Sequence, residues 1–166
     1  MATFQGEAAD LAKLRLALSA PMVAGQSLAG VRLGSSESDV VRDLGAPDRV
    51  SSSLSIKVAD YLEASNTWLR IFLRDGRVDA ILIAVLRLDS APSFSAGLRG
   101  VGLGSTVGAV RNAFGPGTDG RLWYPQLGVA FNPADRERPD NERVYAVLVL
   151  KPGPNDMVEA YGRLAH

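Results

Sequence analysis

An internal repeat constrains the fold of this chain more than any other feature of its sequence. The stretch at residues 30–47 returns about seventy residues later at 100–116, and no gap is needed to align the two copies. A recurring segment of this kind is typical of a chain built from similar structural units. The residues that recur unchanged are Gly30, Val31, Leu33, Gly34, Ser35, Val40 and Gly45, which correspond to Gly100, Val101, Leu103, Gly104, Ser105, Val110 and Gly115.

Each copy of the repeat predicts a short helix between two stop signals. In the first copy Ser35 or Ser36 can cap the helix start, and Ser36 with Asp39 fits a capping box. Val40 and Leu44 form a narrow apolar stripe, while a glycine and then a proline follow and end the helix. The corresponding residues of the second copy are Ser105, Thr106, Val107, Val110, Phe114, Gly115 and Pro116.

Runs of apolar residues after each helix predict antiparallel strands. The first unit has runs at 56–62, 68–74 and 78–87, and the Asp75-Gly76 pair between the last two is a hairpin signal. The second unit has runs at 122–124, 127–131 and 144–151, with a wide loop at 132–143. The run at 78–87 is apolar on both faces, which indicates a central strand covered by the other unit or by a partner chain.

The domain organisation follows from these elements. Residues 4–18 show helical spacing, so we expect an N-terminal helix and linker at 1–27, a first α+β repeat at 28–90 and a second at 97–151. A tail at 152–166 completes the chain and contains a helical segment near 156–164. The fold class predicted is therefore α+β, with two tandem repeats that each pack a short helix on an antiparallel sheet.

Composition excludes several classes of function. The formal net charge is zero, which makes nucleic acid and anionic membranes unlikely primary targets. No apolar run is long enough to cross a bilayer, and the absence of cysteine excludes disulfides and thiolate catalysis. Charged residues and Pro21 interrupt the N-terminus, so it does not fit a secretory signal. We expect a cytoplasmic protein, or a periplasmic or secreted one whose leader has been removed.

The strongest candidate site is a surface on the strand at 68–74. Trp68, Arg70, Phe72 and Arg74 alternate with an apolar set that faces the helix, so they share the opposite face of the sheet. Aromatic and arginine side chains are enriched in binding hot spots, and Trp123 and Tyr124 occupy the equivalent part of the second unit. The alternative is that the aromatic residues of this face pack against the other repeat or the N-terminal helix.

Weaker candidates have simpler explanations. The turn at Gly34 and Ser35 could bind phosphate at a helix start, but helix capping explains these residues and no P-loop lysine follows. The only histidine, His166, is terminal. Scattered carboxylates, which include Asp39, Asp43, Asp60, Glu63, Asp75, Asp79, Asp89 and Asp119, leave a glycosidase-like pair open without identifying one. The loop residues Asp135, Asp140, Asn141 and Glu142 do not match calcium-ligand spacing, and Arg136, Arg138 and Arg143 oppose a cation there. We expect no metal and no cofactor.

The repeat resembles a known structural unit. A Gly-Val-x-Leu-Gly-Ser opening, a short helix that ends in Leu/Phe-Gly, and a hairpin with Gly-Arg-Val resemble the helix-on-sheet unit of the SmpA/OmlA (BamE) and beta-lactamase-inhibitor-protein families. The resemblance covers residues 28–151, and the tandem arrangement is most similar to the inhibitor type. It implies a binding protein of the inhibitor or immunity class that is not an enzyme.

We therefore expect a non-catalytic module that docks another protein on the open sheet face. In this hypothesis Trp68, Phe72 and Tyr124 are apolar anchors, and Arg70 and Arg74 donate hydrogen bonds to the partner. Three alternatives remain open at this point. They are a small-molecule or lipid-binding module with a cavity between the repeats, a carboxylate-dependent hydrolase, and a scaffold that forms a homodimer through residues 78–87.

Overall fold

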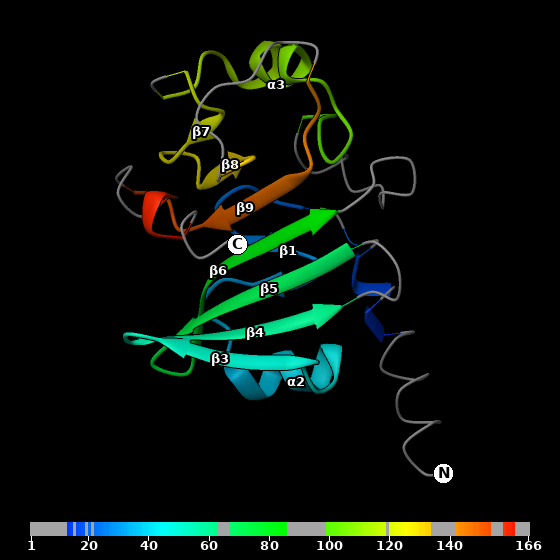
Figure 1. Ribbon diagram of the computed structural model, residues 1–166, viewed down its shortest axis with the longest axis vertical. Coiled ribbons are helices and arrows are strands. Elements are labelled where there is room, and N and C mark those ends of the chain that lie inside the picture. The colour runs from blue at the N-terminus through cyan, green and yellow to red at the C-terminus, as the bar shows by residue number, and fades with distance from the viewer. Residues whose placement is uncertain are drawn as a thin grey trace.

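The computed structural model has an α+β fold in which one large antiparallel sheet dominates (Figure 1). It describes residues 13–14, 16–18, 20, 22–62, 67–85, 99–118, 120–133, 142–153 and 158–161. Seven strands form the main sheet in the order β3-β4-β5-β6-β9-β8-β7. Their bounds are β3 Arg49–Ser53, β4 Ile56–Leu62, β5 Thr67–Arg74, β6 Arg77–Val85, β7 Trp123–Tyr124, β8 Val129–Phe131 and β9 Ala146–Leu150.

Strand β6 lies at the centre of the sheet, as its two apolar faces predict. It pairs with β5 on one side and with β9 on the other, both antiparallel. Ile81, Leu82 and Ile83 are fully buried because both faces of this strand are covered. Residues 86 and 87, which were also expected in the strand, lie outside the described part of the chain. The pairing of β6 with β9 joins segments from the two halves of the chain in one sheet.

Two short helices begin and end where the repeat predicts. Helix α2 spans Glu37–Leu44 and α3 spans Val107–Phe114. Ser36 Oγ accepts the backbone N–H of Asp39 at 3.2 Å, and Thr106 Oγ1 accepts that of Ala109 at 3.1 Å. Each helix is followed by a glycine with positive φ, a conformation that glycine adopts without strain.

The capping box expected at the start of α2 is only half formed. The carboxylate of Asp39 accepts a hydrogen bond from Arg42 Nη1 at 3.0 Å on the helix surface. Arg42 lies one helical turn further along, and a cation at that spacing competes for the carboxylate. The cap therefore depends on the Ser36 hydroxyl.

Both helices cover the same face of the sheet and build the larger core. Val40 and Leu44 of α2, and Val110 of α3, pack in one buried cluster with Ile71 and other inward residues of the central strands. Residues 13, 14 and 16–18 are helical, and Leu14 and Leu18 among them add buried side chains to this cluster. The rest of the expected N-terminal helix lies outside the described residues. None of the helices in the described part of the chain has the length and apolar character needed to span a bilayer.

The sequence does not predict three of the strands. β1 (Ser27–Leu28) and β2 (Val31–Arg32) form a small hairpin on the helix-covered side of the sheet, in a stretch where the sequence predicts a linker and a turn. β3 is composed of five exposed residues, of which three are serines, so it lacks the apolar alternation of a half-buried strand. Its partner β4 fixes it in place through a continuous antiparallel register.

Candidate functional site

The two faces of the sheet differ in what covers them. Leu69, Ile71 and Leu73 point into the helix-covered core, as the alternation along β5 predicts. Trp68 and Phe72 pack in a second cluster on the opposite face. Trp123 of β7 joins that second cluster, whereas its neighbour Tyr124 joins the helical core. We call the sheet face that carries Trp68, Arg70, Arg74 and Trp123 the tryptophan face.

Trp68 lies partly exposed at one side of the tryptophan face. Its indole nitrogen is buried and has no hydrogen-bond partner among the described residues. The guanidinium carbon of Arg70 lies 5.9 Å from the centre of the indole ring, near the limit of a cation–π contact. A cation thus borders the Trp68 ring, and the indole N–H makes no hydrogen bond within the described residues.

Arg70 is locked by a carboxylate from the next strand. Its Nε donates to Asp60 Oδ1 at 2.7 Å and its Nη2 donates to Asp60 Oδ2 at 3.0 Å. The two side chains are 14% and 6% exposed, so both charges are largely removed from water. A two-pronged ion pair of this kind fixes the guanidinium plane and satisfies the buried carboxylate.

Trp123 is the counterpart of Trp68 at the far edge of the sheet. The residue is 5% exposed, and its indole nitrogen is also buried, with no partner in the part of the chain that the structure describes. Arg121 covers the ring at 4.3 Å from its centre. An unmet buried N–H costs free energy, and native proteins rarely retain one without a reason.

Phe72 and Tyr124 do not lie where the docking hypothesis needs them. Phe72 is fully buried, and its ring centre lies 4.8 Å from that of Tyr161 in the C-terminal helical turn at residues 158–161. Tyr124 faces the helical core, where its hydroxyl donates to the Gly115 carbonyl at 2.8 Å. Adjacent residues of a strand point to opposite faces, so Trp123 and Tyr124 cannot share one surface.

Tyr161 ties the C-terminal turn to the sheet. Its hydroxyl donates to Asp79 of β6, and Arg74 Nε approaches the same carboxylate at 3.6 Å. Burial, together with the hydrogen bond to Asp79, raises the pKa of the Tyr161 phenol above its ordinary value, and Arg74 opposes this shift. The turn at 158–161 is thereby held against the tryptophan face through one ring contact and one polar network.

The raised pKa of Tyr161 predicts a loss of stability in alkali. The unfolded chain releases the phenolic proton near pH 10, whereas the folded chain retains it. The contribution is therefore fully present below about pH 10 and is lost as pH rises further. We expect the urea midpoint of the wild type to fall between pH 9 and pH 11, with the phenolate followed by absorbance. The urea midpoint of Tyr161→Phe should fall less steeply over the same pH range. It should still fall, because burial also raises the pKa of Tyr124. Equal slopes for the two proteins would contradict this account.

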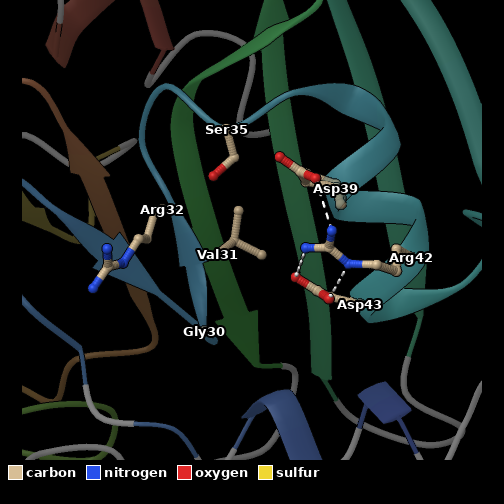
Figure 2. A pocket seen from close by; sticks show the side chains of 8 residues that line it. Gly30, Val31, Arg32, Ser35, Asp39, Arg42 and Asp43 are labelled. Atoms are coloured by element: carbon tan, nitrogen blue, oxygen red, sulfur yellow. Dashed lines mark hydrogen bonds and ion pairs between the residues drawn. The ribbon is translucent and has the colours of Figure 1, made fainter.

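A separate hollow of about 150 Å³ lies between β2 and α2 (Figure 2). Arg42 lies between two carboxylates there, and its nitrogens reach Asp39 at 3.0 Å and Asp43 at 3.1 Å. The hydrogen bond and charge of Asp43, followed by the charge of Asp39, raise the pKa of Arg42, which stays charged. Arg32 points away from this group in Figure 2. The hollow is smaller than typical ligand pockets, and Arg42 already forms ion pairs with both carboxylates.

The other sequence candidates gain no support as sites. At the turn proposed for phosphate, the backbone N–H groups of Gly34, Ser35 and Glu37 already donate to carbonyls. The described residues contain no group of three potential metal ligands. Asp135, Asp140 and Asn141 of the calcium candidate, and the carboxylates Glu63, Asp89 and Asp119, lie outside the described residues.

The sequence alone does not identify the residues that hold the side chains of the tryptophan face in place. Asp60 acts through Arg70 on the neighbouring strand and Asp79 through Tyr161 in the C-terminal turn, whereas Arg121 lies over Trp123, two residues further along the chain. Asp60 is one of many scattered carboxylates in the sequence, yet its place between the apolar residues Ala59 and Tyr61 of a strand signals a buried partner. Arg121 stands two residues before Trp123, and side chains at that spacing share one face of an extended chain.

No protein-family model and no curated protein matches the chain. The solved structures that match it include two at a TM-score of 0.48 each. One is a cysteine-rich secretory protein from Staphylococcus aureus, 12% identical, for which the match covers 72% of this chain and 43% of the other. The second is an extracellular protein containing an SCP domain from Bacillus anthracis, 8% identical, with 72% and 44% covered. This chain thus spans less than half the length of either protein.

The expected resemblance to the SmpA/OmlA (BamE) and beta-lactamase-inhibitor-protein families is wrong. The two solved structures named above are a secretory and an SCP-domain protein, and no family model matches the chain. The motif that suggested the resemblance consists of helix caps, turn glycines and a hairpin turn. Such residues follow from local backbone geometry, so unrelated folds with a short helix between strands share them.

Proposed function

We propose that this protein is a non-catalytic protein-binding module that docks its partner on the tryptophan face. The observation that carries the proposal is the pair of buried indole N–H groups, at Trp68 and Trp123, that lack acceptors within the described residues. A partner that displaces the covering side chain and places a carbonyl at either nitrogen removes the cost of an unmet hydrogen bond. Tryptophan and arginine are also the residue types most enriched in binding hot spots.

The spacing of the two tryptophans favours a macromolecular partner. Trp68 lies on β5 and Trp123 on β7, with β6, β9 and β8 between them. Four strand spacings of about 4.8 Å place the two residues roughly 19 Å apart. A small ligand does not bridge that distance, whereas one protein surface can contact both ends. Arg74 and Arg121 supply donors for partner carboxylates and carbonyls along the same face, while Arg70 stays paired with Asp60.

We further propose that the chain consists of two related α+β units. Support comes from hydrogen bonds that recur at corresponding positions around α2 and α3. Arg77 Nη1 donates to the Gly34 carbonyl at 3.0 Å, and Arg143 Nη1 donates to the Gly104 carbonyl at 2.7 Å. A tyrosine hydroxyl donates to the carbonyl of the glycine after each helix, from Tyr61 to Gly45 and from Tyr124 to Gly115. Two backbone N–H to carbonyl bonds also recur: Gly34 to Val78 corresponds to Gly104 to Val144, and Val78 to Ser35 corresponds to Val144 to Ser105.

Tryptophan emission tests the docking proposal directly, because the chain has only two tryptophans. The protein is used to capture partners from cell fractions, and each purified candidate is titrated while the emission spectrum is followed. We expect a docked partner to shift the emission, and Trp68→Phe and Trp123→Phe each to lose part of that shift. Arg121→Glu should weaken binding by about 30-fold or more, the size of a hot-spot loss of about 2 kcal/mol.

Arg32→Glu is the matched control for this experiment. It makes the same change of charge at an exposed residue of β2 on the helix-covered side. The control should bind as the wild type does. A partner that leaves the emission unchanged and binds the Arg121→Glu variant normally would remove the tryptophan face as the docking surface.

A further inference from the structure

Within the described ranges, strand β3 is an edge strand that no neighbour covers. It pairs with β4 on one side only, and all five of its residues are exposed. The opposite edge of the sheet is different, because β7 has only two residues, both buried, and Thr118 donates to its Trp123 carbonyl at 3.2 Å. Open edges present unpaired backbone groups that accept another strand, and proteins normally blunt them.

The register of β3 shows which backbone groups are free. Asp48 donates its N–H to the Asp60 carbonyl at 2.8 Å, and the two-residue turn at Leu54 and Ser55 closes on the pair Ser53 and Ile56. Along an antiparallel pair every second residue directs its N–H and C=O at the neighbour. Val50 and Ser52 are the intervening residues, so their backbone groups point away from β4.

The charge beside this edge selects the partner's chemistry. Arg49 is the cross-strand neighbour of Asp60, but Arg70 already occupies both oxygens of that carboxylate. Within the described residues, the exposed Arg49 guanidinium has no ion pair or hydrogen bond. An acidic side chain directly opposite a cation stabilises strand pairing.

The second face of the edge carries one exposed apolar side chain, Val50, beside Ser52. Val50 is 51% exposed, and Val41 of α2 is 41% exposed on the same, helix-covered side of the sheet. β-Branched residues of an added strand would pack beside Val50, since cross-strand apolar pairs stabilise a sheet. An added strand with acidic residues on one face and β-branched residues on the other therefore complements β3 on both sides.

We propose that the β3 edge binds an extended segment of a partner protein as an eighth strand, with acidic side chains facing Arg49. The main-chain hydrogen bonds of Val50 and Ser52 supply affinity, and Arg49 and Val50 supply specificity. Arg49 lies on the same side of the sheet as the tryptophan face, but neither Trp68 nor Arg121 belongs to the β3 edge. Arg121→Glu therefore tests the first proposal and Ser52→Pro tests the second, so the two can fail independently.

Selection from a phage library of random linear heptapeptides tests the proposal on the full chain. The baits are the wild type, Ser52→Pro, its matched control Ser52→Ala, and Arg49→Glu, after circular dichroism has confirmed that each folds. Proline at position 52 removes an outward N–H without removing a bond to β4, whereas alanine keeps it. We expect wild type and Ser52→Ala to enrich peptides that alternate Asp or Glu with β-branched residues. Ser52→Pro should bind these peptides at least tenfold more weakly, and Arg49→Glu should enrich Lys or Arg instead.

A synthetic peptide from the selection gives a second readout that does not depend on a variant. N-methylation of alternate amides should abolish binding in one of the two possible patterns only, because one set pairs with β3 and the other faces away. Equal binding of both N-methylated patterns, or no enrichment above the Ser52→Pro bait, would overturn the proposal. Sedimentation that shows a wild-type dimer lost in Ser52→Pro would also overturn it, in favour of a second copy of this chain. Arg32→Glu should leave peptide binding unchanged.

Discussion

Phe72→Ala should lower the free energy of unfolding by about 3–5 kcal/mol, the usual cost of removing a buried phenylalanine. The side chain is fully buried and packs with Leu82, Leu148 and Tyr161 on the side of the sheet away from the helices. Truncation removes the apolar contact and leaves a cavity between the sheet and the C-terminal turn, because β5 cannot collapse into the space. Urea unfolding followed by circular dichroism measures the change.

Arg74→Ala is the control for this prediction. Arg74 is on the same face two residues further along β5, and its side chain is 45% exposed. The control should change stability by less than about 1 kcal/mol, as exposed ion pairs usually do. A Phe72→Ala protein of wild-type stability that loses partner binding would contradict the structure and restore Phe72 as a docking residue.

Asp60→Ala should be about as damaging, with a loss of about 3–5 kcal/mol, because it leaves the Arg70 cation largely buried without its carboxylate. The cost comes from the unpaired charge more than from the lost attraction. Replacement of both partners by apolar residues of similar volume, Asp60→Val with Arg70→Met, should recover most of the stability.

A double-mutant cycle separates these two effects. The single variants Asp60→Ala and Arg70→Ala are measured beside the double variant, and their coupling free energy is obtained from the urea unfolding curves. We expect the double variant to be less destabilised than the sum of the two singles. Additive effects would mean that the pair does not act as a unit. The proposed docking on Trp68 also predicts tighter partner binding when Arg70 stays locked, which the emission titration can follow.

Local patterns predicted most regular elements of the fold. The alternation along residues 68–74 predicted a strand and the face that the helices cover, and the two-faced run at 78–87 predicted the central strand. The serines, threonines and glycines of the repeat predicted both helices, since capping depends on neighbours within a few residues. These features are readable because their physical cause is local.

Elements that depend on distant partners could not be read in this way. Nothing in the serine-rich segment of β3 indicates a strand until β4 is present to pair with it. Phe72 has the alternation of an exposed docking residue, but the C-terminal turn at 158–161 covers it from about ninety residues away. The family resemblance failed for a related reason, because its motif reports caps and turns and not the arrangement of the strands.

The sequence by itself determined the helix boundaries, the hairpin at Asp75 and Gly76, the inward face of β5 and the α+β class, because each follows from backbone preference or from side-chain period. Only the tertiary structure decided the strand order, the burial of Phe72, the bidentate pairing of Arg70 with Asp60 and the exposure of β3 as an open edge. Those features come from contacts between residues far apart in the chain, and their free energy depends on which surfaces the folded sheet brings together.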